Sequence, residues 1–133
     1  MDEQERVSAF LQADCFAVVG ASRDRAKYGN KVLRAYLQRG YRVLAVNPHE
    51  TEVEGVSSYP DLASLPERVE AVSIITPPPV TERIVEQAAA AGVRHLWMQP
   101  GAESPDAIRL AEKLGMNVIS SGPCILVTLR YRE

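Results

Sequence analysis

Residues 16–46 read FAVVGASRDRAKYGNKVLRAYLQRGYRVLAV, and the order of patterns within them decides the fold. The apolar run Phe16 to Gly20 predicts a short strand that ends at a glycine. Apolar residues then recur at helical spacing from about Gly29 to Arg39, which predicts a helix. Tyr41 to Val46 is a second apolar run and predicts a second strand. A strand, a glycine turn, a helix and another strand are typical of a parallel α/β unit.

The same alternation continues along the rest of the chain. Further strands are expected over Glu70–Thr76, Val93–Gln99 and Met116–Ser120, and further helices over Val80–Ala91 and Pro105–Leu114. The segment Thr51 to Pro66 is too short for a full helix and predicts a loop with one or two turns. We therefore predict a three-layer α/β, Rossmann-like fold with a five-stranded parallel sheet. Its probable order is 3-2-1-4-5, with the strands numbered along the chain.

Length and composition predict one domain, residues 1–133. We expect a leader helix over 1–14, an α/β core over 15–121 and a C-terminal tail over 122–133. Fifteen Lys and Arg against seventeen Asp and Glu give a net charge of −2, which argues against nucleic-acid or anionic-membrane binding. No apolar run approaches the length of a membrane span, and the acidic start does not fit a signal peptide. We expect a cytoplasmic protein.

Residues that follow the predicted strands form one candidate binding site, because ligands of such sheets bind beyond the carboxyl ends of the strands. The candidates of this kind are Gly20, Ala21, Ser22, Asn47, Pro48, Thr76, Pro77, Pro78, Pro79, Val80, Gln99 and Gly101. Gly20 permits a sharp turn and the close approach of a phosphate to the backbone. The three consecutive prolines remove backbone donors and stiffen the chain, so they predict an apolar wall suited to adenine.

The segment that follows Gly20 is locally basic. Between Ser22 and Lys31 the cations are Arg23, Arg25, Lys27 and Lys31, and Asp24 is the single acid. Backbone N–H groups, the Ser22 hydroxyl and the start of the next helix add to this charge, so the loop suits a pyrophosphate. An ordinary solvated turn is the alternative.

The G-x-G-x-x-G fingerprint of dinucleotide-binding domains is incomplete in this sequence. Ser22 stands in the place of the second glycine, and Gly29 could replace the third only after a longer loop. The second strand ends in Asn47-Pro48, where an acid would bind the ribose of NAD. These details do not fit NAD.

Taken in order, the turns resemble those of the small stand-alone CoA-binding proteins and of the N-terminal CoA-binding domain of the succinyl-CoA synthetase α subunit. The similar motifs are Gly20-Ala21-Ser22, Gly29-Asn30-Lys31-Val32, Val46-Asn47-Pro48, Thr76 to Val80 and Gln99-Pro100-Gly101, which span residues 16–119. The synthetase has a lysine near the CoA phosphates where this sequence has Glu50, so that contact is not implied.

The resemblance implies a binding site for CoA or acyl-CoA. It implies that the pyrophosphate lies at Ala21, Ser22 and the start of the first predicted helix, which contains Gly29 and Asn30. It also implies that Arg23, Arg25 or Lys27 neutralises phosphates. Asn47 and Pro48 would border the nucleotide, and Thr76 to Val80 would pack against it.

Catalysis is not expected. The synthetase transfers phosphate through a histidine of a second domain, which has no counterpart in these 133 residues. His49 and His95 are the only histidines, and neither belongs to a recognised catalytic motif. We therefore predict a non-catalytic binding or regulatory module. The alternatives are an NAD(P)-binding oxidoreductase-like domain, and an interaction protein with a vestigial crevice that forms a homo-oligomer or binds a protein partner.

The two cysteines predict neither a metal site nor a redox motif. Cys15 and Cys124 are far apart in the sequence and lack paired spacing, so reduced thiols are expected. Cys124 follows the last predicted strand in Ser120-Ser121-Gly122-Pro123-Cys124. We expect a buried, unreactive thiol there, and the alternative is a thiol that meets that of CoA at the crevice mouth.

Overall fold

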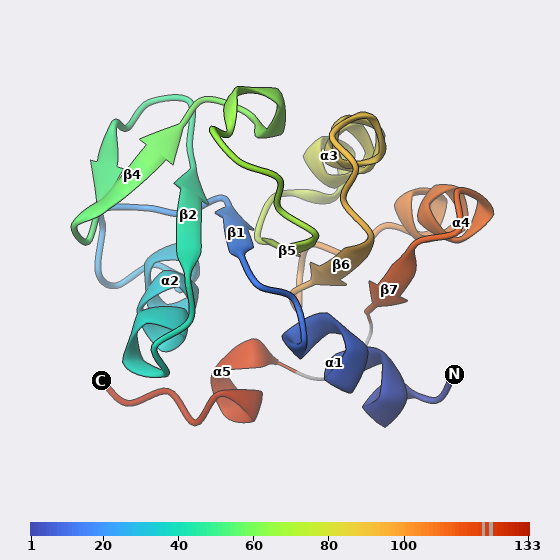
Figure 1. Ribbon diagram of the computed structural model, residues 1–133, viewed down its shortest axis with the longest axis horizontal. Coiled ribbons are helices and arrows are strands. Elements are labelled where there is room, and N and C mark those ends of the chain that lie inside the picture. The colour runs from blue at the N-terminus through green and yellow to red at the C-terminus, as the bar shows by residue number, and fades with distance from the viewer. Residues whose placement is uncertain (121, 123) are drawn as a thin grey trace.

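The computed structural model describes residues 1–120, 122 and 124–133 of the chain (Figure 1). Seven strands in this part form one sheet in the order β3-β4-β2-β1-β5-β6-β7. The strands are β1 (Phe16–Val19), β2 (Val43–Val46), β3 (Glu52–Val53), β4 (Val56–Tyr59), β5 (Ala71–Ile74), β6 (His95–Met98) and β7 (Asn117–Ile119). All neighbouring pairs are parallel except β3 and β4.

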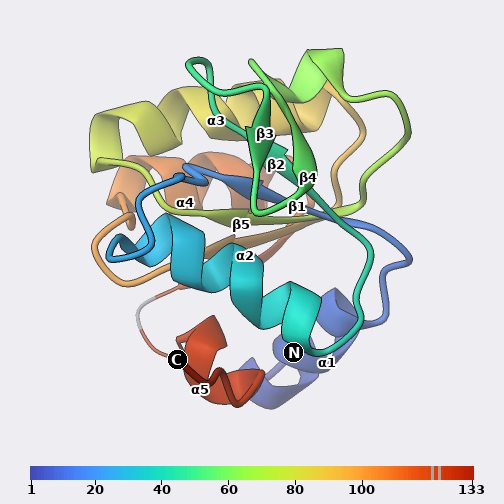
Figure 2. The same ribbon diagram turned by 90° about the vertical axis from the view of Figure 1, so that its left-hand side faces the viewer.

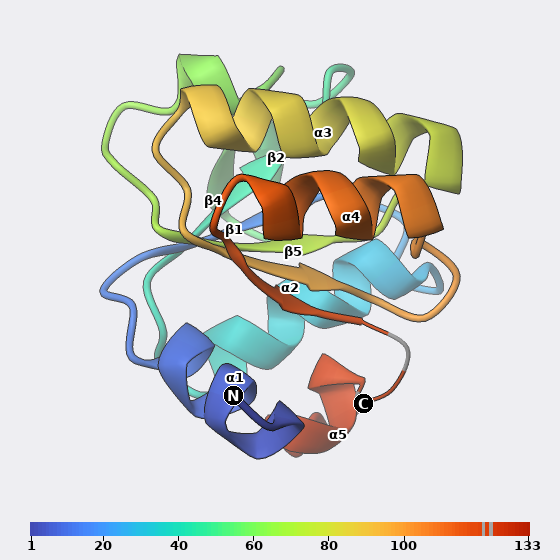
Figure 3. The ribbon, with the colours of Figure 1, turned by 90° about the vertical axis from the view of Figure 1, so that its right-hand side faces the viewer.

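Helices cover both faces of the sheet, which confirms the α/β class. They are α1 (Glu3–Leu11), α2 (Tyr28–Gln38), α3 (Pro78–Ala90), α4 (Pro105–Lys113) and α5 (Ile125–Thr128), with a 3₁₀ turn, η1 (Leu62–Ser64). Figures 2 and 3 show α3 and α4 on one face and α1, α2 and α5 on the other. No helix among the described residues has both the length and the apolar character that crossing a bilayer requires.

The face covered by α1, α2 and α5 contains the aromatic part of the core. The ring of Phe16 in β1 lies 5.0 Å from that of Tyr36 in a tilted arrangement, and Phe10 of α1 meets Trp97 edge to face at 5.3 Å. Tyr36 is fully buried, and its hydroxyl shares a hydrogen bond of 2.6 Å with the Ser73 hydroxyl of β5. These contacts fix α2 against the centre of the sheet.

The predicted strand number and strand order are wrong. The order 3-2-1-4-5 placed the strand expected over Glu70–Thr76 beyond the second strand, whereas β5 pairs with β1, with Phe16 opposite Ala71. The five expected strands therefore run 2-1-3-4-5. The position beside β2 is taken by β4, with Ala45 opposite Ser58.

The loop predicted over Thr51 to Pro66 contains a β-hairpin and η1. Its tight turn is Glu54-Gly55, where φ is +50° and +79°. A two-residue hairpin turn needs positive φ at both positions, for which Asn-Gly and Asp-Gly are the usual signals. Glu-Gly is a weaker signal, and the half-polar strand β4 has little apolar character of its own, so pairing with β2 decides its conformation.

Candidate functional site

Two glycines bring the start of α2 against the end of β1. Gly20 has φ +95°, and a Cβ there would lie 2.0 Å from the Ile75 carbonyl oxygen. A Cβ on Gly29 would lie 1.9 Å from the Gly20 carbonyl oxygen. Both distances are far too short for a side chain, so packing of the backbone requires these glycines.

A cavity of about 360 Å³ opens beside the Gly20 turn, at the carboxyl ends of β1, β2 and β5. It is lined by Val19, Gly20, Val46, Asn47, Pro48, His49, Pro60, Asp61, Thr76, Val80, Arg83, Ile84 and Gln87. Five of the predicted site residues therefore meet here, namely Gly20, Asn47, Pro48, Thr76 and Val80.

A second hollow of about 350 Å³ adjoins the first at Thr76. It is lined by Ile75, Thr76, Pro77, Pro100, Gly101 and Ala102, so it includes two further predicted site residues, Pro77 and Gly101. The Thr76 hydroxyl bonds to that of Thr81 at 2.8 Å and ties the end of β5 to the first turn of α3. Pro78 and Pro79 are exposed in that turn and line neither hollow.

Two predicted ligand contacts, Asn30 and Asn47, hold the loop that follows Gly20. Asn47 donates from Nδ2 to the Ala21 carbonyl at 2.6 Å, and the fully buried Asn30 donates from Nδ2 to the Ser22 carbonyl at 2.8 Å. The Ser22 hydroxyl accepts from the backbone N–H of Asp24 at 3.1 Å. These side chains therefore shape the loop.

Most of the cations of this loop have an acidic partner in the fold. Arg25 pairs with Glu54, Arg23 lies 3.8 Å from Glu50, and Lys31 lies 2.8 Å from Glu133. Two contacts lower the pKa of Glu54. The hydrogen bond from Asn30 has the larger effect, and the contact with Arg25 has a smaller one.

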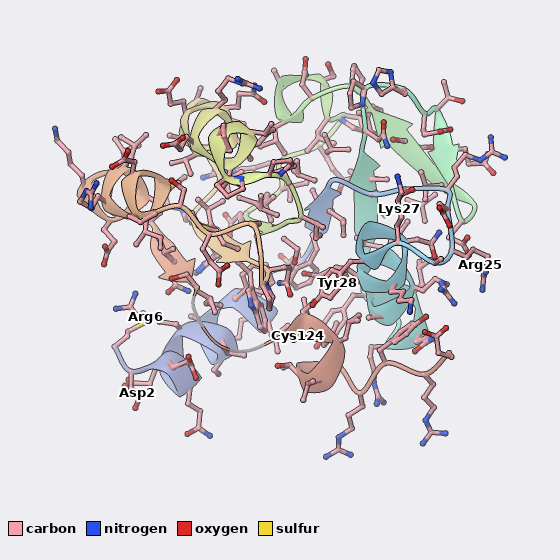
Figure 4. All side chains as sticks on the ribbon, turned by 180° about the vertical axis from the view of Figure 1, so that it is seen from behind. Asp2, Arg6, Arg25, Lys27, Tyr28 and Cys124 are labelled. Atoms are coloured by element: carbon pink, nitrogen blue, oxygen red, sulfur yellow. The ribbon has the colours of Figure 1, made fainter. Side chains whose placement is uncertain are left out.

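Lys27 is exposed and has no ion-pair partner among the described residues; Figure 4 shows it on the loop with Arg25. The acids that pair with this loop lie in the segment after β2 and at the C-terminal end, so local charge counting could not find them.

Sequence reasoning predicted Val80 but missed the rest of the wall that α3 contributes to the cavity. Val80, Arg83, Ile84 and Gln87 recur at helical spacing and all line it. Arg83 is exposed and has no ion-pair partner in the described part of the chain. The helical spacing of these residues could be seen in the sequence. Which face of α3 meets the ends of the strands could not.

Gln99, a predicted contact, lies inside the protein and lines neither hollow. Its Oε1 accepts from the Tyr28 hydroxyl at 3.2 Å and from the Ile125 N–H at 3.1 Å. The Tyr28 hydroxyl also contacts the half-buried Cys124 thiol, and Figure 4 shows the two side chains together. Burial, together with this thiol, raises the pKa of Tyr28.

The Cys124 thiol thus shares a hydrogen bond with the Tyr28 hydroxyl and lies outside both hollows. Ser121 and Pro123, in the turn expected before it, lie outside the described residues.

The two histidines lie far apart in the fold. His49 lines the cavity, whereas His95 begins β6 at the amino edge of the sheet, where its Nδ1 lies 3.0 Å from Asn117 Nδ2. Burial lowers the pKa of His95. In the residues described, no group of three or more His, Cys, Asp or Glu side chains could hold a metal ion.

These observations define an α/β domain whose two adjoining hollows form a groove at the carboxyl edge of a mostly parallel sheet, next to a glycine turn. The chain belongs to the CoA binding domain family, which it matches over residues 14–130. The resemblance to CoA-binding proteins that was based on the ordered turns is confirmed.

The matched curated relatives are much longer proteins. The chain is 26% identical over 113 residues to acetate–CoA ligase [ADP-forming] I of Archaeoglobus fulgidus, covering 77% of this chain and 16% of that one. It is 27% identical over 121 residues to the α subunit of acetate–CoA ligase [ADP-forming] II of Pyrococcus furiosus, covering 83% and 26%. The chain thus spans about a sixth of the length of the first relative and about a quarter of the length of the second.

Solved structures with the same fold include chains of similar size. A conserved hypothetical protein from Pyrococcus furiosus is 42% identical with a TM-score of 0.79, covering 85% of this chain and 97% of that one. A Thermus thermophilus protein is 28% identical with a TM-score of 0.88, covering 98% of both. The dinucleotide-forming acetyl-coenzyme A synthetase 1 of Candidatus Korarchaeum cryptofilum, solved with phosphate and ADP, is 29% identical with a TM-score of 0.76, covering 90% and 27%.

Proposed function

We propose that this chain binds coenzyme A or acyl-CoA in the groove at the carboxyl edge of the sheet and catalyses no reaction. The observation that carries the proposal is the cavity of about 360 Å³ beside the Gly20 turn. It lies at the low end of the roughly 300 to 1,000 Å³ typical of small-molecule sites, so it suits the adenosine part of the ligand. Val46, Val80 and Ile84 offer apolar contacts for the adenine faces.

The rest of the ligand is assigned from the features next to this cavity. The hollow lined by Pro77, Pro100 and Gly101 adjoins it at Thr76 and suits the pantetheine arm. The backbone of the loop after Gly20 suits the pyrophosphate. Both assignments follow from the position of these features around a bound adenosine.

Two cations are available to the phosphates. Lys27 stands on the loop and Arg83 on α3, and neither has an ion-pair partner among the described residues. We assign the pyrophosphate to Lys27 and the 3′-phosphate to Arg83, in place of Arg23 and Arg25, whose charges are already paired.

The proposal of binding without catalysis rests on the cavity lining. Among its described residues the one hydroxyl is that of Thr76, and its partner at 2.8 Å is Thr81 rather than a histidine or a carboxylate. An activated nucleophile needs such a base within reach. The ligase activity named for the longer relatives is not assigned to this chain.

Isothermal titration calorimetry of the full chain with CoA, dephospho-CoA and NAD tests the proposal. We expect CoA to bind and dephospho-CoA to bind more weakly, because a hydrogen bond to a charged group contributes about 1.5 to 3 kcal/mol, or roughly tenfold or more. Absence of CoA binding at millimolar ligand, or tighter binding of NAD, would refute it.

The variant Arg83→Gln tests which group reads the 3′-phosphate. We expect it to bind CoA and dephospho-CoA with nearly equal affinity. Arg109→Gln is the matched control, because Arg109 lies on α4, lines neither hollow, and has the exposed Asp106 as its ion-pair partner. If Arg83→Gln keeps the full preference for CoA, the 3′-phosphate is recognised elsewhere.

A further inference from the structure

Arg34 of α2 contacts three parts of the chain, one of which is distant in the sequence. Its Nε donates to Asn30 Oδ1 at 2.7 Å, and one terminal nitrogen donates to the Arg25 carbonyl at 2.9 Å. Its guanidinium also lies over the Tyr131 ring, 5.4 Å from the centroid. One side chain therefore contacts the first turns of α2, the loop after Gly20 and the C-terminal end.

The bond to Asn30 fixes which way the Asn30 amide points. A guanidinium only donates, so the amide oxygen must face Arg34 and the amide nitrogen must face away. That nitrogen donates to the Ser22 carbonyl at 2.8 Å and to Glu54 Oε2 at 3.1 Å. Asn30 is fully buried, so an amide turned the other way would leave the Ser22 carbonyl without this donor.

Arg34 thus holds the loop at two points. It holds Ser22 through Asn30, and it holds the Arg25 carbonyl directly. Lys27 follows two residues after the second point. Since the side chains of Arg23 and Arg25 are paired with acids, the geometry of this backbone matters more for an anionic ligand than the charge of the loop.

The C-terminal segment, residues 129–133, supports Arg34 from the other side. It runs antiparallel along α2: Arg39 donates to the Leu129 carbonyl at 2.6 Å, and the Gln38 amide makes two bonds to the backbone of Arg132 at 2.6 and 3.0 Å. Figure 1 shows the C-terminal end beside α2. These bonds keep Tyr131 against the Arg34 guanidinium.

We propose that Arg34 is a positioning residue that holds the loop of residues 22–27 in the conformation that receives the pyrophosphate of the ligand, supported by Tyr131. The inference rests on the proposed function for the identity of the ligand. Arg34 lines neither hollow, so it acts through the loop. A loop held before binding does not have to be ordered when the ligand arrives, and this raises affinity.

Affinity for two ligands separates positioning from general damage. Arg34→Ala should weaken CoA binding by about tenfold, equivalent to about 1.4 kcal/mol, because the loop must then be ordered on binding. Binding of adenosine 3′-monophosphate, which lacks the pyrophosphate, should stay within about twofold. Arg34→Lys should be intermediate, since an ammonium group cannot span both acceptors with fixed geometry.

Arg109→Ala is the matched control, because it removes an arginine of α4, on the opposite face of the sheet from α2 (Figure 3), whose ion-pair partner is the exposed Asp106. It should leave both affinities unchanged. Equal losses for both ligands in Arg34→Ala and Arg34→Lys, or no loss of CoA affinity in either, would overturn the inference.

Hydrogen–deuterium exchange tests the same inference without any ligand, so it remains decisive if CoA does not bind. Both Arg34 variants should exchange the amides of Asp24, Ala26 and Lys27 faster than the native chain, because these amides are bonded within the loop. The Arg109→Ala control should leave the exchange of these amides unchanged. Native exchange of the loop in Arg34→Ala and Arg34→Lys would refute the positioning role even if the proposed function is correct.

Discussion

Gly29→Ala tests the close packing on which the groove depends, and its two energetic effects have opposite signs. In an open helix, alanine is about 1 kcal/mol more favourable than glycine. At this position, however, the new Cβ would lie 1.9 Å from the Gly20 carbonyl oxygen, about 1 Å closer than the 3.0 Å that real Cβ atoms respect. The atom that the new Cβ would meet belongs to the backbone, so no flexible side chain can move away to relieve the clash.

The expected result is a net loss of stability. Overpacking costs typically 1 to 3 kcal/mol and occasionally more, and a rigid backbone contact belongs at the upper end. After subtracting the gain in helix propensity, we expect a loss of about 2 kcal/mol, which for a domain of this size lowers Tm by roughly 8 °C. If the space were open, Tm would rise by about 4 °C.

Differential scanning calorimetry of the full chain measures this directly. Gly115→Ala is the comparison, because Gly115 has φ +78° but no atom within 4 Å of its Cβ position. Its free energy of unfolding should fall only by the cost of a side chain at positive φ, which is about 1 kcal/mol. A Tm for Gly29→Ala at or above that of the native chain would refute the proposed contact between α2 and the Gly20 turn.

Two other predictions concern buried polar pairs. Tyr36→Phe should lower the free energy of unfolding by about 1 to 3 kcal/mol in urea titrations, since it leaves the buried Ser73 hydroxyl without its partner at 2.6 Å; adding Ser73→Ala should restore part of the loss, and no loss in the single variant would contradict this. Burial, opposed in part by Glu70, lowers the pKa of His95 from 6.5, so the unfolded chain binds the proton more tightly. The free energy of unfolding should therefore fall as the pH decreases through 6.5 and level off below the lowered pKa, and His95→Gln should fall less; an equal pH dependence in both proteins would show that this histidine is not responsible.

Much of the fold was predictable because it is encoded in local patterns. The helix expected over Gly29 to Arg39 is α2, and the five expected strands all exist as shorter strands. The hairpin β3–β4 was missed because its turn, Glu54-Gly55, carries a weak signal and its strand β4 is half polar. The order of the strands was wrong because a strand pattern states that a segment is buried and extended, and does not state which neighbour it pairs with.

The candidate site was predictable in position but not in the role of each side chain. Gly20, Thr76 and Val80 meet at one cavity, as expected from the rule that ligands bind at the carboxyl ends of the strands. Asn30 was expected to contact the ligand, whereas its amide is committed to the loop backbone. Arg83 was not expected at all, because its place at the cavity depends on how α3 is rotated over the sheet.

By itself the sequence determined where the chain must turn and what kind of segment lies between the turns, because glycine, proline and apolar periodicity act on neighbours a few residues apart. It also carried the ordered turns that identify the family. Only the tertiary structure decided which charges remain available. The four cations between Ser22 and Lys31 are a basic cluster when counted along the chain, yet Glu50, Glu54 and Glu133 come from other segments to pair with three of them. Charge pairing depends on distance in space, and that distance is set by the folding of segments whose order in the sequence does not reveal it.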